Sequence, residues 1–208
     1  MYCISNEIHP YFLEEWGLYW ASYLHEKALK AEKKIEVTEM YFNSNLDDDQ
    51  HRLSLKERTD LLTYFEASQN TGRLHYLEYA RSAMSNNPRP INNVKIYGGV
   101  NGMWLNLFGG SASARFHRPS HEERTGRHVG GQGLNSYARA QIKSARMLFE
   151  HFNIFESTPD WDHNQLIDRD KEEAFLLYQP GKQYAIYFPD GGAVMLELPD
   201  TQGKWKLM

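Results

Sequence analysis

Strand-like and helix-like segments alternate about five times over residues 1–152, and this order limits the fold more than any other feature. The strands are predicted at 1–5, 35–41, 62–67, 91–97 and 112–117, and the helices at 12–33, near 54–57, at 73–84, 103–108 and 134–152. Such alternation indicates parallel strands joined by right-handed crossovers. The first strand is followed by Asn6-Glu7 rather than by a glycine-rich phosphate loop, which argues against a dinucleotide-binding doubly wound sheet.

The pattern changes after Pro159, where short strand-like runs are separated by turn residues. These runs are 174–178, 184–188, 193–198 and 204–207. The Asp190-Gly191 dipeptide between the second and third runs is the strongest hairpin signal. We therefore expect an antiparallel meander at 158–208, forming a second and incomplete β domain after an α/β domain at 1–157.

Composition excludes several classes of protein. The 208 residues carry 23 Lys+Arg against 27 Asp+Glu, a net charge of −4, and no basic run that would serve a nucleic-acid interface. No apolar run approaches the roughly 18 residues of a membrane span, and the N-terminus shows no signal-peptide pattern. The nine histidines include no His-Glu-x-x-His zinc motif, so we expect neither a metal nor another cofactor. The single cysteine, Cys3, is predicted to be a packed thiol in a buried strand.

The dipeptide Asn6-Glu7 directly follows the first predicted strand. Functional side chains of parallel α/β barrels lie at the carboxyl ends of strands. A glutamate there can protonate a leaving sugar oxygen, while the asparagine amide binds a neighbouring hydroxyl. The same dipeptide could equally serve only as the entry to the helix that follows.

Other polar residues share the strand-end position. Glu39 and Glu66 lie late in the second and third predicted strands, where two carboxylates roughly 5–5.5 Å apart would suit a retaining glycosidase. Arg115 and His117 end the fifth strand and could bind sugar hydroxyls. The alternative for Glu39 is a solvated or ion-paired strand residue, and the alternative for Arg115 and His117 is carboxylate pairing at the barrel rim.

Several strings resemble a known family. They are Tyr2-Cys-Ile-Ser-Asn-Glu7, Val37-Thr-Glu-Met-Tyr41, Ser68-Gln-Asn70, Pro90 to Gly98 and Gly110 to Pro119. Together they resemble the apiosidase-like, clan A bacterial glycoside hydrolases, many of which are described only as domains of unknown function. The tail from Gln183 to Val194 is similar to the β-sandwich that follows such barrels, often labelled a collagen-binding domain of a collagenase.

The resemblance implies that residue 1 falls at strand 4 of an eight-stranded barrel. Clan A enzymes place the acid/base glutamate after an asparagine at the end of strand 4, which matches Asn6-Glu7. They place the nucleophile at the end of strand 7, yet the matching stretch Ile91–Gly99 contains no carboxylate. Glu66 or Glu39 would then have to substitute.

These inferences combine into one hypothesis: the chain is the C-terminal half of a (β/α)8 barrel, strands 4–8, joined to the start of an antiparallel β-sandwich. The expected activity is hydrolysis of O-glycosidic bonds in an oligo- or polysaccharide, with Glu7 as acid/base, Glu66 as nucleophile and Asn6 on the substrate. The expected substrate-binding residues are Glu39, Tyr97, Trp104, Arg115 and His117.

Two further expectations accompany this hypothesis. Exposed barrel edges would favour self-association. The parent protein would be exported, with its signal peptide in a missing upstream part. The alternatives are a non-catalytic carbohydrate- or collagen-binding module and an inactive truncated product.

Overall fold

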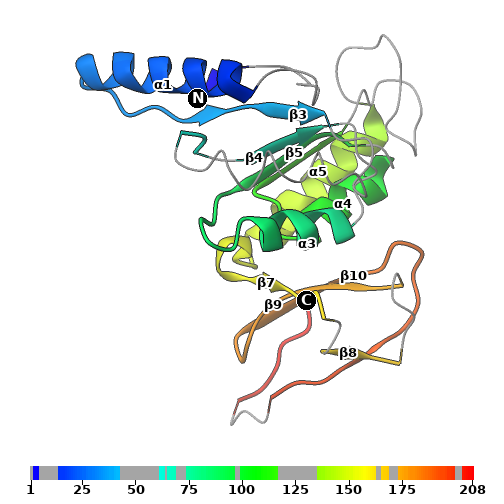
Figure 1. Cartoon of the computed structure of the whole chain (residues 1–208). Coiled ribbons are helices and arrows are strands. Elements are labelled where there is room, and N and C mark those ends of the chain that lie inside the picture. Colours follow the sequence, from blue (N-terminus) through cyan, green and yellow to red (C-terminus); the bar gives the residue numbers. More distant parts are fainter. Residues whose placement is uncertain are drawn as a thin grey trace.

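The computed structural model describes residues 2–4, 14–42, 61–63, 65–68, 74–96, 99–116, 135–162, 165–168, 173–199 and 203–208. It is a mixed α/β structure with small parallel and antiparallel sheets. Figure 1 shows helix α1 (Glu14–Lys30) and the parallel strands in the upper part, the other helices lower down, and an antiparallel region at the bottom beside the C-terminus.

The parallel part confirms the predicted alternation. Its strands are β1 (Tyr2–Cys3), β2 (Val37–Thr38), β3 (Met40–Phe42), β4 (Phe65–Ser68), β5 (Ile91–Ile96) and β6 (Ser113–Phe116). β1 pairs with β2, and β3, β4, β5 and β6 pair in that order, every pair parallel. Only Glu39 separates β2 from β3, so five extended segments lie side by side in chain order. Within the described residues β6 does not pair with β1, and no closed barrel forms.

The helices lie where apolar spacing predicts them. They are α1 (Glu14–Lys30), α3 (Leu74–Ala83), α4 (Gly99–Phe108) and α5 (Ser136–Phe149). α4 begins four residues before its predicted start at Met103. α5 begins at an Asn135 cap, whose side chain accepts a 2.7 Å hydrogen bond from the Ala138 amide. The short helix predicted near 54–57 lies outside the described residues.

The largest core cluster among the described residues joins the parallel and antiparallel parts. The buried side chains of α4 and α5 pack against those of β9 (Phe175–Gln179) and β10 (Gln183–Tyr187). The members are Met103, Trp104, Leu107, Phe108, Ala145, Phe152, Phe175, Leu177 and Ala185. The sequence boundary expected at 157/158 therefore crosses a continuous apolar core.

The antiparallel region differs from the predicted meander. Its other elements are the 3₁₀ turn η1 (Ile154–Glu156) and the strands β7 (Thr158–Pro159), β8 (Leu166–Ile167) and β11 (Met195–Leu196). β9 and β10 form the hairpin around Gly181, but β11 pairs with β8 rather than with β10. Gly191 and Gly192 still turn the chain with positive φ, yet the turn leads across to β8. Residues 204–207 form no strand, so that prediction is wrong.

The prediction of a buried Cys3 is also wrong. Cys3 is exposed, and Tyr2 beside it is 50% exposed. In the described residues β1 has one neighbouring strand, β2, so little of its surface is covered. A short apolar run predicts a buried strand correctly only where other elements of the fold cover that strand.

Candidate functional site

The carboxyl ends of the five parallel segments are the edge at which a site is predicted. Each of these segments ends within two residues of a stretch that lies outside the described residues. The stretches begin at residue 5 after β1, 43 after β3, 69 after β4, 97 after β5 and 117 after β6. Asn6, Glu7, Tyr97 and His117 all belong to these stretches. The parallel register nevertheless directs all five strands toward one edge of the sheet.

Glu66 is the predicted site residue with the most informative surroundings. It is second in β4, 5% exposed, and two residues from the strand's carboxyl end. Its Oε1 accepts a 3.1 Å hydrogen bond from Nδ2 of Asn92, and the Asn92 Oδ1 accepts one from the Ser113 hydroxyl. Glu66, Asn92 and Ser113 occupy paired positions on β4, β5 and β6, so they form one row across the sheet.

The row lies on the face of the sheet that points away from α4. Asn93, the next residue of β5, donates a 2.6 Å hydrogen bond to Oδ1 of Asn106 on α4. Since successive side chains of a strand point to opposite faces, Asn92 and the paired Glu66 face the other side. The second carboxylate oxygen of Glu66, Oε2, is buried and accepts no hydrogen bond from the described residues. A buried carboxylate oxygen without a hydrogen-bond donor can accept a proton, or a hydrogen bond from a substrate hydroxyl.

Glu39 does not share this face with Glu66. Met40 is paired with Glu66, and Glu39 directly precedes Met40 in an extended segment. Alternation therefore places the Glu39 side chain on the opposite face of the sheet, where it is 5% exposed. The register brings Glu66 together with Asn92 and Ser113, two residues that the sequence analysis missed and that only strand pairing could identify.

Trp104, a predicted substrate-binding residue, lies on α4 and not at the carboxyl end of a strand. It is 8% exposed on α4, its indole nitrogen donates a 2.8 Å hydrogen bond to Gln141, and its ring stacks on Tyr187 at 5.6 Å. These contacts place it in the core behind the sheet, because Trp104 and Phe108 continue one apolar stripe of α4. Arg115 lies in β6, and its side chain lies outside the description.

One further sequence signal was missed. His117 and His121 are four residues apart, a spacing that can bind zinc on a helix. Both lie outside the described residues, and Pro119 between them is unfavourable for a helix. Within the described residues, no three His, Cys, Asp or Glu side chains come together as a metal site.

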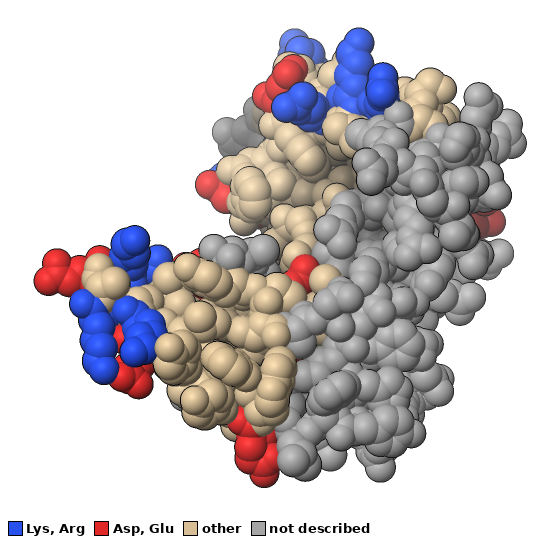
Figure 2. Space-filling model, turned by 90° about the horizontal axis from the view of Figure 1, so that it is seen from above, with Lys and Arg blue, Asp and Glu red and all other residues tan. Residues whose placement is uncertain are grey.

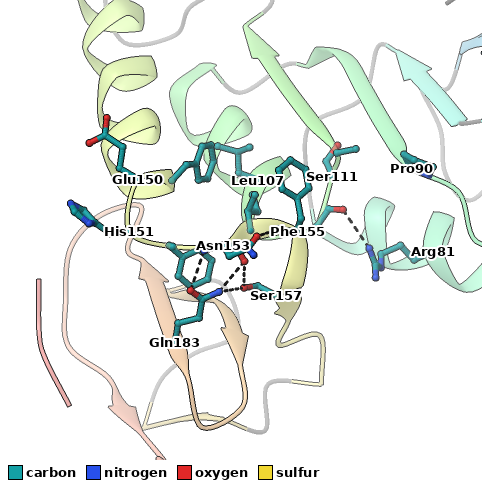
Figure 3. A pocket seen from close by; sticks show the side chains of 15 residues that line it. Arg81, Pro90, Leu107, Ser111, Glu150, His151, Asn153, Phe155, Ser157 and Gln183 are labelled. Carbon is teal, nitrogen blue, oxygen red and sulfur yellow. Dashed lines mark hydrogen bonds between the residues drawn. The ribbon is translucent and has the colours of Figure 1, made fainter. Parts of the chain in front are cut away.

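A cavity of about 680 Å³ opens where α5 meets the antiparallel region (Figure 3). Its lining includes Pro90 and Ala112, which directly precede β5 and β6, so it lies near the amino ends of these strands and the predicted site near their carboxyl ends. Gln183 of β10 accepts a 3.0 Å hydrogen bond from the Asn153 amide and donates to the Asn153 carbonyl and the Ser157 hydroxyl. Arg81 points to the Gly110 carbonyl, and Glu150 and His151 point outward. The polar groups of this cavity thus mainly satisfy one another and join the two parts of the chain.

A second, larger hollow of about 1050 Å³ lies between β10 and the C-terminal segment 203–208. Tyr184 stacks on Tyr178 with ring centroids 5.7 Å apart, and Trp205 meets Tyr184 edge-on at 5.4 Å. Trp205 is 41% exposed. The hollow therefore offers aromatic surface to solvent beside three lysines, Lys182, Lys204 and Lys206.

Comparisons of the chain with protein-family models, with curated proteins and with solved structures found no match. No helix in the described part of the chain is both long and apolar enough to cross a membrane.

Proposed function

We propose that this protein is a glycoside hydrolase that cleaves O-glycosidic bonds of an oligo- or polysaccharide by carboxylate acid/base catalysis. The observation that carries the proposal is the parallel register of the five strand segments. It brings the carboxyl ends of β1, β5 and β6 to one edge, four residues before Glu7 and directly before Tyr97 and His117 in the sequence. Strand ends arranged in this way are where α/β barrels carry their catalytic groups.

The finer architecture belongs to the same proposal. The order β1, β2–β3, β4, β5, β6 corresponds to strands 4–8 of a (β/α)8 barrel, followed by part of a β-sandwich. The resemblance to apiosidase-like clan A enzymes supports this assignment on the strings from Tyr2 to Pro119. Under it, residue 1 corresponds to the fourth barrel strand.

The roles follow from chemistry. Glu7 donates a proton to the leaving glycosidic oxygen, while the Glu66 carboxylate attacks the anomeric carbon and forms a glycosyl ester. Glu7 then takes a proton from water, which attacks the same carbon and releases Glu66. Asn6 binds the neighbouring hydroxyl, and Glu39, Tyr97, Arg115 and His117 contact other parts of the sugar. The hydrogen bond from Asn92 holds Oε1 of Glu66 and leaves Oε2 for the attack.

The acid/base role is tested by Glu7→Gln, with Glu78→Gln, an exposed position on α3, as the matched control. Hydrolysis of a panel of aryl glycosides by Glu7→Gln should fall by about 10²–10⁴-fold, while the control keeps the wild-type rate. Azide should restore part of the turnover in Glu7→Ala, because it needs no base to attack the glycosyl ester. An unchanged rate in Glu7→Gln removes Glu7 from the mechanism.

The nucleophile is tested separately by trapping. A 2-deoxy-2-fluoro aryl glycoside slows hydrolysis of the glycosyl ester, and peptide mass mapping should place the sugar on Glu66. A label on Glu39 would reassign the nucleophile, and an inverted product without any label would remove Glu66 from this role.

The hollow beside Trp205 favours a second candidate function, non-catalytic carbohydrate binding. Exposed aromatic rings with polar groups nearby are typical of sites for ligands that are apolar on one face and polar at the edges. Trp205→Ala should weaken retention on insoluble glycans, whereas Phe155→Ala, an 88% exposed aromatic outside this hollow, should not. Retention on collagen fibrils alone would instead favour a fibrous protein ligand, and wild-type retention by Trp205→Ala would exclude Trp205 from either role.

A further inference from the structure

Helix α1 turns its aromatic side chains outward. Trp16, Tyr19, Trp20 and Tyr23 are 42%, 61%, 39% and 39% exposed, whereas the face packed on β2 carries small residues such as Gly17 and Ala21. Figure 2, which views the molecule from above, shows a stretch of uncharged surface next to a projecting group of blue and red charged side chains. An exposed aromatic patch of this density marks an interaction surface.

The charges along α1 suggest what covers this patch. Residues four apart lie in one row on a helix, and the row Glu15, Tyr19, Tyr23, Lys27 runs through the patch. The Tyr19 and Tyr23 rings stack at 6.4 Å, and the Lys27 amine lies 5.2 Å from the Tyr23 ring centroid. Among the described residues neither Glu15 nor Lys27 forms a salt bridge.

This row is complementary to itself when reversed. Read in one direction it is acid, tyrosine, tyrosine, base, and a second copy in the opposite direction presents base, tyrosine, tyrosine, acid. Glu15 then meets the Lys27 of the other copy at both ends, and Tyr19 meets Tyr23 in the middle. Two-fold symmetric contacts require this kind of self-complementarity.

The geometry of helix packing agrees. Rows of residues four apart pack against each other in the commonest class of helix–helix contact, which keeps the two rows parallel along their length. The row from Glu15 to Lys27 covers about 18 Å at 1.5 Å per residue. Trp16 and Trp20 lie beside it, and buried tryptophans and tyrosines supply most of the binding energy at protein interfaces.

We propose that α1 forms a two-fold symmetric contact between two copies of this chain, with the Glu15–Tyr19–Tyr23–Lys27 rows antiparallel. This contact uses a helix face, and it is distinct from pairing of strands at the edges of the sheet. It does not depend on the proposed activity, because none of these side chains is assigned to the catalytic site.

The experiment uses charge reversal in the full chain, with molar mass followed by sedimentation velocity between about 1 and 100 µM. The wild type should dimerise. Glu15→Lys and Lys27→Glu should each raise the dimer Kd by about tenfold or more, since each replaces two attractive pairs by two repulsive ones. Lys143→Glu on α5, an exposed position away from α1, is the control and should not change the Kd.

Two combinations make the test decisive. The double variant Glu15→Lys/Lys27→Glu carries the reversed row, which is again self-complementary, and should recover the wild-type dimer. A mixture of the two single variants should form heterodimers although each alone is weakened. A wild-type chain that stays monomeric up to 100 µM, or a dimer insensitive to both reversals, overturns the proposal.

Discussion

The helices at the two ends of the parallel sheet differ in how far their aromatic side chains are buried. At the β5–β6 end, Trp104 of α4 is 8% exposed and enclosed by α5 and β10, whereas at the β1 end Trp16 of α1 is 42% exposed. Among the described residues, the buried members of the cluster at the β1 end are the smaller side chains Ala21, Val37 and Leu62. Both helices carry an aromatic stripe in the sequence, so the stripe identifies a surface suited to packing, and the difference comes from which elements the rest of the chain supplies.

The largest expected difference in the free energy of unfolding is between variants of the two tryptophans. Trp104→Ala should lower the free energy of unfolding by about 3–5 kcal/mol, because it leaves a cavity in the shared core and frees Gln141 from its hydrogen bond. Trp16→Ala should cost less than about 1 kcal/mol in dilute solution, since much of that ring already contacts water. Urea unfolding at low protein concentration measures both values. Equal losses would remove the contrast between the two ends.

An intermediate effect is expected at two glycines with positive φ. A Cβ on Gly110, at φ +76°, would lie 2.9 Å from Cγ of Pro159 and 3.1 Å from the Arg81 guanidinium, whereas a Cβ on Gly181, at φ +71°, would meet nothing within 4 Å. Gly110→Ala should therefore cost about 2–4 kcal/mol, from backbone strain plus overpacking. Gly181→Ala should cost about 1 kcal/mol, from strain alone. Thermal melts of the two variants provide the comparison, and similar losses would show that the Gly110 joint is loosely packed.

The smallest expected effect is the pH dependence of stability that Tyr187 contributes. Tyr187 lies against Trp104 and donates a 2.7 Å hydrogen bond to Oδ1 of Asn101. Burial, with smaller contributions from Tyr137 and Asp190, raises the pKa of Tyr187 to about 12. Because the folded state holds the proton more tightly than the unfolded state, this stabilisation is complete below pH 10 and is lost as the pH rises toward 12. The difference in stability between wild type and Tyr187→Phe should shrink across that window, as followed by unfolding at fixed alkaline pH. A constant difference would contradict the raised pKa.

The sequence predicted the parallel part well because its signals are local. The apolar spacing in 12–33 and 134–152 identifies α1 and α5, and the strand order follows from the alternation. The direction in which α1 presents its aromatics was not predictable, because small residues such as Ala21 on the other face also pack well. Trp104 illustrates the same difficulty, since its burial depends on β10, more than 75 residues later.

The antiparallel part was less predictable because its strands are short and pair across long separations. β7 contains Pro159 and β8 has two residues, and neither carries an alternation that could be recognised. The Asp190-Gly191 turn was identified, but its partner strand was not. In the candidate site, Glu66 could be identified from its position late in a predicted strand. Its link to Asn92 and Ser113 depends on strand register, which no short motif encodes.

The core shared by α4, α5, β9 and β10 also determines how this polypeptide can be cut and recombined. Exchanging everything after residue 157 for an unrelated module would leave Trp104, Phe108 and Phe152 facing water. Grafts intended to keep the upstream half intact should therefore carry the β9–β10 hairpin with it and place the splice beyond Phe188.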